Sequence, residues 1–191
     1  MGTHGSRVNA LGFAFAAPGE YKTGQKNTMK FNLIDRIDLL TDTRIVAAKQ
    51  VSLAEEYLAD HFPTFPVLPG VMMIEAVVQA AGWLLHHRRQ FACSIVVLKE
   101  ARNVKYGRFV APGDVLKVDV QYLKDTPAGA QFKATGFVGQ SQAISARIEL
   151  AYFNLVDKQA GSVAVDEQLR AHTQDRWDIL KLTLGKTAIA I

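Results

Sequence analysis

The chain has 191 residues, of which 49% are hydrophobic and 21% charged, and this composition excludes a disordered or fibrous protein. The length suits a single domain with a substantial core and is short for two. The formal charge of +4 favours an acidic partner, whether nucleic acid, an anionic cofactor tail or an acidic carrier protein.

The cysteine count and the hydropathy pattern bear on the cellular compartment and on whether the chain spans a membrane. Cys93 is the only cysteine, so one chain can form neither an internal disulfide nor a cysteine-based metal cluster. No apolar stretch reaches the roughly 18 to 20 residues that a membrane span needs. The N-terminus lacks the basic cluster and apolar run of a secretory signal. We therefore expect a cytoplasmic protein that does not span a membrane.

The first sixty residues contain one irregular segment and three short elements. Residues 1–28 are rich in Gly, Thr, Ser and Lys without any period, which predicts a flexible leader. Residues 34–40 alternate apolar and polar side chains, and residues 44–53 are rich in β-branched ones, so the two runs predict a β-hairpin. Residues 54–60 are expected to form a short helix with Ser52 as its N-cap.

The most apolar run of the chain predicts a long helix from about Pro69 to His87. Every residue from 71 to 85 is apolar or small except Glu75 and Gln79, which lie four apart and therefore share one helix face. We expect both to be buried on most packings of this helix.

Four strand candidates follow at regular spacing and predict an antiparallel meander. They are residues 94–104, 114–125, 130–140 and 142–155, separated by turn sequences. One long helix lying against one curved antiparallel sheet satisfies these patterns together, which makes the chain an α+β protein. The main domain is placed at residues 29–156.

The character of the chain changes after this domain. Residues 157–191 are treated as a C-terminal appendage that is partly helical. An amphipathic helix there has its apolar side formed by Leu169, Trp177, Leu180 and Leu184.

Two titratable residues stand where they can do chemistry. Burial favours the protonated form of a carboxyl group, so Glu75 could act as a general acid oriented by Gln79, or it could pair with a cation in a structural role. His61 could act as a general base, or be an ordinary surface histidine. The loop after His61 holds three prolines and ends at Gly70, whose free N–H at a helix N-terminus could polarise a carbonyl oxygen. An acid, a base and an oxyanion site are the parts needed to eliminate water from a carbon β to a carbonyl.

A longer motif carries a resemblance. The segments HFP (61–63), PVLPGV (66–71), IEA (74–76) and QA (79–80), with a histidine-to-glutamate spacing of 14, resemble the signature of the 3-hydroxyacyl-[acyl-carrier-protein] dehydratases of fatty-acid synthesis, which have the hot-dog fold. The segment 103–114 is similar to that family's next landmark, a basic strand leading to a Pro-Gly-Asp turn. The resemblance covers about residues 31–155.

The resemblance implies a long helix wrapped by an antiparallel sheet, pairing of two such units, and often three dimers in a hexamer. It assigns His61 to abstraction of the α-proton, Glu75 of the other subunit to protonation of the departing hydroxyl, and Gly70 to holding the thioester oxygen. The other substrate contacts are expected at Phe62, Pro69, Val71 and Gln79. The implied substrate is a 3-hydroxyacyl thioester on acyl carrier protein or coenzyme A, with no metal or redox cofactor.

Two residues depart from the family pattern, which has glycine at both places: Asp60 before the histidine and Thr64 after the HFP. They keep two alternatives open. One is a hot-dog thioesterase in which Glu75 activates water, and the other is a non-catalytic subunit that binds an acyl group or a carrier protein.

The basic residues from His86 to Arg89 complement the dipole at a helix C-terminus, and we expect this end to be solvated. The functional alternative is an electrostatic site for an acidic carrier protein or a phosphopantetheine phosphate. That site would also use Lys99, Arg102, Lys105 and Arg108. Nucleic-acid binding is disfavoured because no recognisable module interleaves these charges with exposed aromatic residues.

Overall fold

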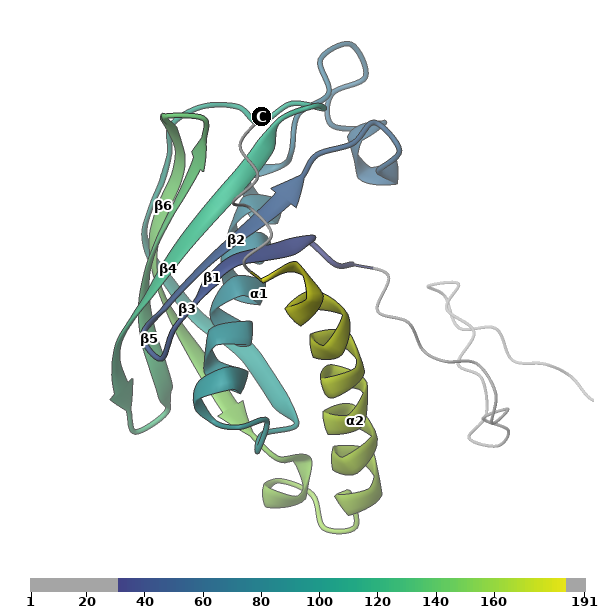
Figure 1. Ribbon diagram of the computed structural model, residues 1–191, viewed down its shortest axis with the longest axis vertical. Helices are drawn as coiled ribbons and strands as arrows, with labels where there is room; N and C mark the ends of the chain where they lie inside the picture. Colours follow the sequence, from purple (N-terminus) through teal and green to yellow (C-terminus); the bar gives the residue numbers. More distant parts are fainter. Residues whose placement is uncertain (1–30, 185–191) are drawn as a thin grey trace, which may run out of the picture. The chain divides into compact units, whose positions relative to one another are not determined.

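The computed structural model describes residues 31–184, and the part from Asn32 onward forms one compact unit (Figure 1). The strands are β1 (Arg36–Leu40), β2 (Arg44–Gln50), β3 (Ile95–Tyr106), β4 (Val115–Thr126), β5 (Gly129–Val138) and β6 (Ser141–Phe153). The helices are α1 (Gly70–Arg88) and α2 (Val163–Leu180), with single 3-10 turns η1 (Glu56–Leu58), η2 (Leu155–Asp157) and η3 (Lys181–Thr183). The predicted leader, residues 1–28, lies outside the described residues.

The six strands form one antiparallel sheet in the order β1-β2-β4-β5-β6-β3. The predicted hairpin of β1 and β2 is confirmed, and so is the meander of β4, β5 and β6. The placement of β3 in that meander is wrong, because β3 pairs with β6 at the far edge of the sheet. Alternation along a strand shows which face is buried but not which strand lies beside it, so the sequence could not reveal this crossover.

Helix α1 lies against the concave side of the curved sheet, as predicted (Figure 1). Its small side chains make this close approach possible, since Ala76, Ala80 and Ala81 are fully buried. They pack with strand residues such as Leu116, Ile144 and Phe132, which are also fully buried. The helix therefore covers the concave face of the sheet, while Gly70, Val71 and Met72 in its first turn keep exposed surface.

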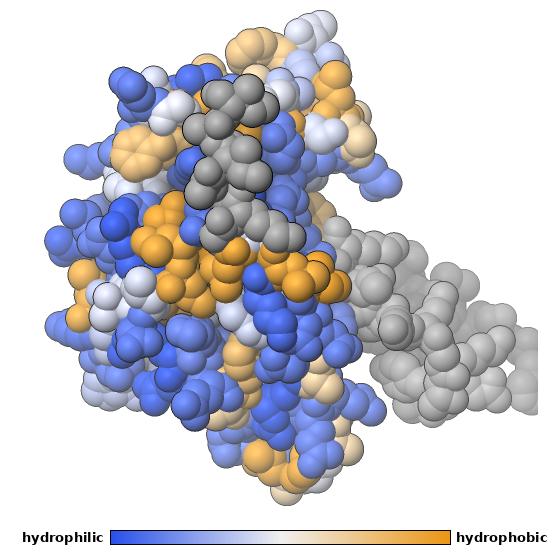
Figure 2. Space-filling model, in the orientation of Figure 1, coloured by the Kyte–Doolittle hydropathy of each residue, from blue (hydrophilic) through white to orange (hydrophobic). Residues whose placement is uncertain are grey.

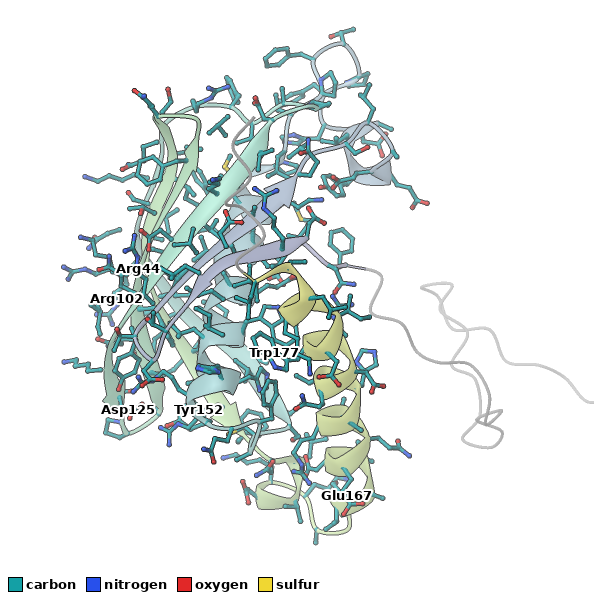
Figure 3. All side chains as sticks on the ribbon, viewed as in Figure 1. Arg44, Arg102, Asp125, Tyr152, Glu167 and Trp177 are labelled. Atoms are coloured by element: carbon teal, nitrogen blue, oxygen red, sulfur yellow. The ribbon has the colours of Figure 1, made fainter. Side chains whose placement is uncertain are left out.

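The C-terminal helix α2 runs beside α1 on the side that the sheet leaves uncovered (Figure 1). Three of the four residues of the predicted apolar side reach the core: Leu180 is buried in it, and Trp177 and Leu184 pack against it, whereas Leu169 is half-buried outside that cluster. Trp177 points from α2 toward α1 (Figure 3). There its ring centroid lies 6.0 Å from that of Trp83 and 5.9 Å from that of Phe91. Trp177, Leu180 and Leu184 thus share the core of the sheet and α1.

Two local predictions fail. Residues 54–60 form only the 3-10 turn η1, and Ser52 accepts the Ala54 N–H rather than capping a helix. The basic end of α1 is not simply solvated, because the Arg88 guanidinium stacks on the Tyr122 ring at 3.7 Å and that of Arg89 on Tyr152 at 4.5 Å.

Within residues 31–184, no helix is long and apolar enough to cross a membrane.

Candidate active site

The loop between η1 and α1 is held by backbone hydrogen bonds rather than by its prolines alone. The Val67 N–H donates to the His61 carbonyl oxygen at 2.9 Å, and the Leu68 N–H donates to that of Val110 at 2.7 Å. Val67 and Leu68 are both buried at 1% exposure, so the end of the loop is anchored in the core. This anchoring holds His61 in a loop that leads directly into α1 at Gly70.

The imidazole of His61 is oriented by a single backbone contact. Its Nδ1 lies 3.1 Å from the Val67 carbonyl oxygen. A carbonyl oxygen can only accept, so Nδ1 carries a proton, and in the neutral ring Nε2 then has the lone pair. The ring stacks on Phe62 at a centroid distance of 4.5 Å. His61 is therefore half-buried and in the tautomer that a general base requires.

Glu75 is oriented by a chain of two side-chain hydrogen bonds. The Gln79 Nε2 donates to Glu75 Oε1 at 2.9 Å, as the spacing of four residues predicts. The Gln79 Oε1 in turn accepts the Leu33 N–H at 2.9 Å. A backbone N–H can only donate, so this bond fixes which end of the Gln79 amide faces Glu75. Both side chains are partly buried rather than fully buried, which corrects the sequence expectation.

The N-terminus of α1 offers donors for an oxygen atom. Helix α1 begins at Gly70 after Pro69, which has no side-chain cap, and helix geometry leaves the N–H groups of Gly70 and Val71 without an intrahelical partner. Val71 is 72% exposed. A Cβ on Gly70 would lie 3.0 Å from two ring carbons of Tyr106, so glycine permits this close approach. Tyr106 was not predicted as a site residue, because the sequence marks it only as part of a basic strand.

Apolar side chains are exposed around this loop. Figure 2 shows them at the top of the view, over the segment between β2 and α1. Phe62 is 53% exposed and Phe65 54%, and Phe109 meets Phe65 edge-on at a centroid distance of 5.8 Å. Sequence inspection did not single out Phe65 or Phe109 as a pair, because 44 residues separate them. Asp60 and Thr64, the two departures from the family pattern, are both exposed.

His61 and Glu75 have different hydrogen-bond partners within the described residues. Among the described contacts His61 bonds to the backbone of its own loop and Glu75 to Gln79, and no hydrogen bond joins the two. No group of three or more His, Cys, Asp or Glu side chains in residues 31–184 is placed to hold a metal ion.

The predicted carrier-docking residues lie on and just beyond β3. Arg102 is exposed on the side of the sheet away from α1 (Figure 3), where its Nε pairs with Glu100 at 2.6 Å. Arg108 pairs with Asp114 at 3.2 Å, and Lys105 is exposed. Two of these three residues lie on β3 and Arg108 follows it, and two of the three charges, those of Arg102 and Arg108, are already paired with carboxylates.

Comparison with known proteins gives a consistent result. A family model described as FabA-like domain matches residues 26–147, more than half of the chain. The protein named 3-hydroxyacyl-[acyl-carrier-protein] dehydratase FabZ of Solibacter usitatus is 36% identical over 138 residues, 72% of this chain and 83% of the relative. The protein of the same name from Clostridium perfringens is 32% identical over 121 residues, 63% of this chain and 87% of the relative.

Solved structures support the fold. The structure titled the dehydratase heterocomplex ApeI:P from Xenorhabdus doucetiae superposes with a TM-score of 0.53 at 20% identity, covering 64% of this chain and 84% of that one. At that identity the likeness establishes the architecture alone, which is the hot-dog fold expected from the sequence. On the match to residues 26–147 and the similarity over most of each relative's length, the chain belongs to the FabA-like domain family.

Proposed function

We propose that this protein is a dehydratase that converts 3-hydroxyacyl thioesters on acyl carrier protein to trans-2-enoyl thioesters. The observation that carries the proposal is the orientation of His61, whose Nδ1 bonds to the Val67 carbonyl oxygen and whose Nε2 has no hydrogen-bond partner within residues 31–184. This geometry occurs in a member of the FabA-like family that resembles named dehydratases over 87% of their length.

The proposed reaction uses the three parts of the site in turn. Nε2 of His61 removes the proton from Cα of the substrate, and the electron pair of that C–H bond forms the Cα–Cβ double bond. The Cβ–O bond breaks, and the carboxyl group of Glu75 supplies the proton that lets the hydroxyl leave as water. The N–H groups of Gly70 and Val71 hold the thioester oxygen, on which negative charge develops. These roles stay predictions from the resemblance.

We further propose that the catalytic unit is a homodimer in which His61 of one subunit works with Glu75 of the other. Two features support it. Strand β3 is at the sheet edge, with Val97 44% and Leu98 40% exposed, and an edge of this kind can continue a sheet into a second subunit. The apolar side chains around the His61 loop also need a partner surface or an acyl chain to cover them. The hexamer of three dimers and the cytoplasmic location stay predictions.

The test is an assay of crotonyl and longer enoyl thioesters, on carrier protein and on coenzyme A, with wild type and His61→Ala. Loss of a general base lowers the rate by about 10²- to 10⁴-fold. His172→Ala, a histidine on α2, is the matched control and should keep wild-type activity. Equal rates for wild type and His61→Ala would refute the proposal.

The same assay separates the alternatives. Release of free thiol without hydration would identify a thioesterase, and binding of an acyl-pantetheine without turnover at any chain length would identify a non-catalytic subunit. Sedimentation velocity checks the assembly, and a monomer that retains full activity would contradict the shared site.

A further inference from the structure

The C-terminal helix contacts the rest of the protein at three places, and these contacts make it more than an appendage. We call the segment Val163–Thr183, which comprises α2 and η3, the C-terminal strap. It runs beside α1 from the end of β6 to the side of β1 (Figure 1).

The first anchor lies at the start of the strap. The Asp166 carboxylate is 1% exposed and accepts the N–H groups of Leu155 at 2.8 Å and Val156 at 2.9 Å, together with the hydroxyl of Ser94. The Arg170 guanidinium adds a bond to Asn154 at 3.0 Å. This end of the strap is thus fixed to the residues that follow β6 and precede β3.

The second anchor is aromatic. Trp177 meets Trp83, His87 and Phe91 at centroid distances of 6.0, 6.3 and 5.9 Å. Rings at these separations are in contact, so the middle of the strap is packed on the second half of α1.

The third anchor is a hydrogen bond from the edge strand β1 to Thr183 at the end of the strap. Strand β1 is an edge strand, and an edge strand has backbone N–H groups that no neighbouring strand accepts. The Thr183 Oγ1 accepts the Ile37 N–H at 2.9 Å while its hydroxyl donates to the Leu180 carbonyl oxygen at 2.6 Å. Leu180 is buried at 4% exposure in the core that Ile37 also enters. The end of the strap therefore supplies the partner that β1 lacks.

This edge leads to the acid of the site. Four residues before Ile37, the Leu33 N–H donates to Gln79 Oε1, and Gln79 Nε2 donates to Glu75 Oε1. Leu33 and Ile37 are both buried, at 2% and 0% exposure, so the backbone between them is held by the same core. A shift of β1 on the sheet would move the donor that fixes the Gln79 amide.

We propose that the C-terminal strap is a positioning element for the carboxyl group of Glu75, acting through Thr183, β1, Leu33 and Gln79. The inference rests on the proposed function, because it assigns the strap an effect on the acid of that reaction. Thr183 and Gln79 are positioning residues, since neither is proposed to touch the reacting atoms.

The central variant is Thr183→Val, which keeps the shape of the side chain and removes the hydroxyl. It should lower kcat about three- to tenfold, the rate equivalent of one hydrogen bond's net contribution, with KM unchanged. Thr183→Ser restores the hydroxyl and should restore kcat. Leu182→Ala changes the neighbouring side chain, which is 61% exposed, and should leave kcat at the wild-type value.

A double-mutant cycle tests the route. In a Gln79→Leu background the amide relay is gone, so adding Thr183→Val should lower kcat no further. Independent, multiplicative losses would show that Thr183 acts in some other way and would overturn the proposal. An unchanged kcat in Thr183→Val, or an equal loss in Leu182→Ala, would also overturn it.

Amide hydrogen exchange tests the inference without any turnover. The Leu33 and Ile37 amides should exchange faster in Thr183→Val than in wild type, while amides of β5 stay unchanged. Equal protection of Leu33 in the two proteins would overturn the strap proposal even if both are active. If wild type has no dehydratase activity, the proposed function is refuted. Faster exchange of Leu33 in Thr183→Val would then still support the structural link from the strap to Gln79.

Discussion

The stability of this protein should depend on pH through one histidine, His86. Its imidazole stacks on the Phe91 ring at a centroid distance of 5.6 Å and 10° between planes, and lies 6.1 Å from Trp83. These rings stand between α1 and the C-terminal strap. Burial there disfavours the imidazolium and lowers the pKa of His86 from 6.5 to about 4.

The sign follows from linkage between proton binding and folding. The unfolded chain binds the proton near pH 6.5, whereas the folded protein resists it until about pH 4. The stability associated with neutral His86 is therefore complete above the unfolded pKa and is lost as the pH falls toward the folded one. With about 1.36 kcal/mol per pKa unit, the loss between pH 7.5 and 4.5 is about 2.5 kcal/mol.

The measurement is urea denaturation of wild type, His86→Phe and His87→Gln across that pH range. His86→Phe keeps a planar ring against Phe91 and cannot be protonated. The free energy of unfolding of His86→Phe minus that of wild type should therefore rise by about 2.5 kcal/mol between pH 7.5 and pH 4.5. His87→Gln, one position along α1, should follow wild type. If the gap between wild type and His86→Phe does not change with pH, the assignment of the acid sensitivity to this histidine is wrong.

Two further predictions concern the same strap. Burial opposes ionisation of Asp166, but hydrogen bonds from Ser94, Val156 and Leu155 outweigh it and lower the pKa, so its stabilising effect is present above about pH 4 and fades at lower pH. Asp166→Asn should therefore melt at a lower temperature than wild type at pH 7, with a gap that narrows toward pH 3 in circular dichroism melts; a constant gap would contradict this. Trp177→Ala should cost about 2 kcal/mol in urea, less than a fully buried tryptophan, and an unchanged midpoint would show that the α1–α2 contact is not stabilising.

Local chemistry explains why much of the fold was predictable. The length of the apolar run from 71 to 85 favours a buried helix over a strand, and the alternation in β4 and β6 favours strands with one face in a core. The pairing of β3 with β6 was not predictable, because it depends on a crossover between segments that are about fifty residues apart and equally compatible with other neighbours.

In the candidate site, the residues were predictable from the motif but their backbone partners were not. His61, Glu75, Gln79 and Gly70 were named from the motif, and the predicted bond between Gln79 and Glu75 is present at 2.9 Å. The partner of His61 is a carbonyl oxygen, and the partner of Gln79 is the N–H of Leu33. Every residue except proline has both backbone groups, so no pattern of side chains marks which of them will be used.

The sequence by itself determined the α1 helix and the residues predicted for the candidate site, because the spacing of 14 from His61 to Glu75 and the Pro-rich approach to Gly70 are properties of consecutive residues. Only the tertiary structure decided how those residues are held. The Leu33 N–H and the Thr183 hydroxyl reach the site and its neighbouring strand from positions 46 residues before Gln79 and 146 residues after Ile37. Contacts over such separations arise when the core closes, and local preferences do not contain them.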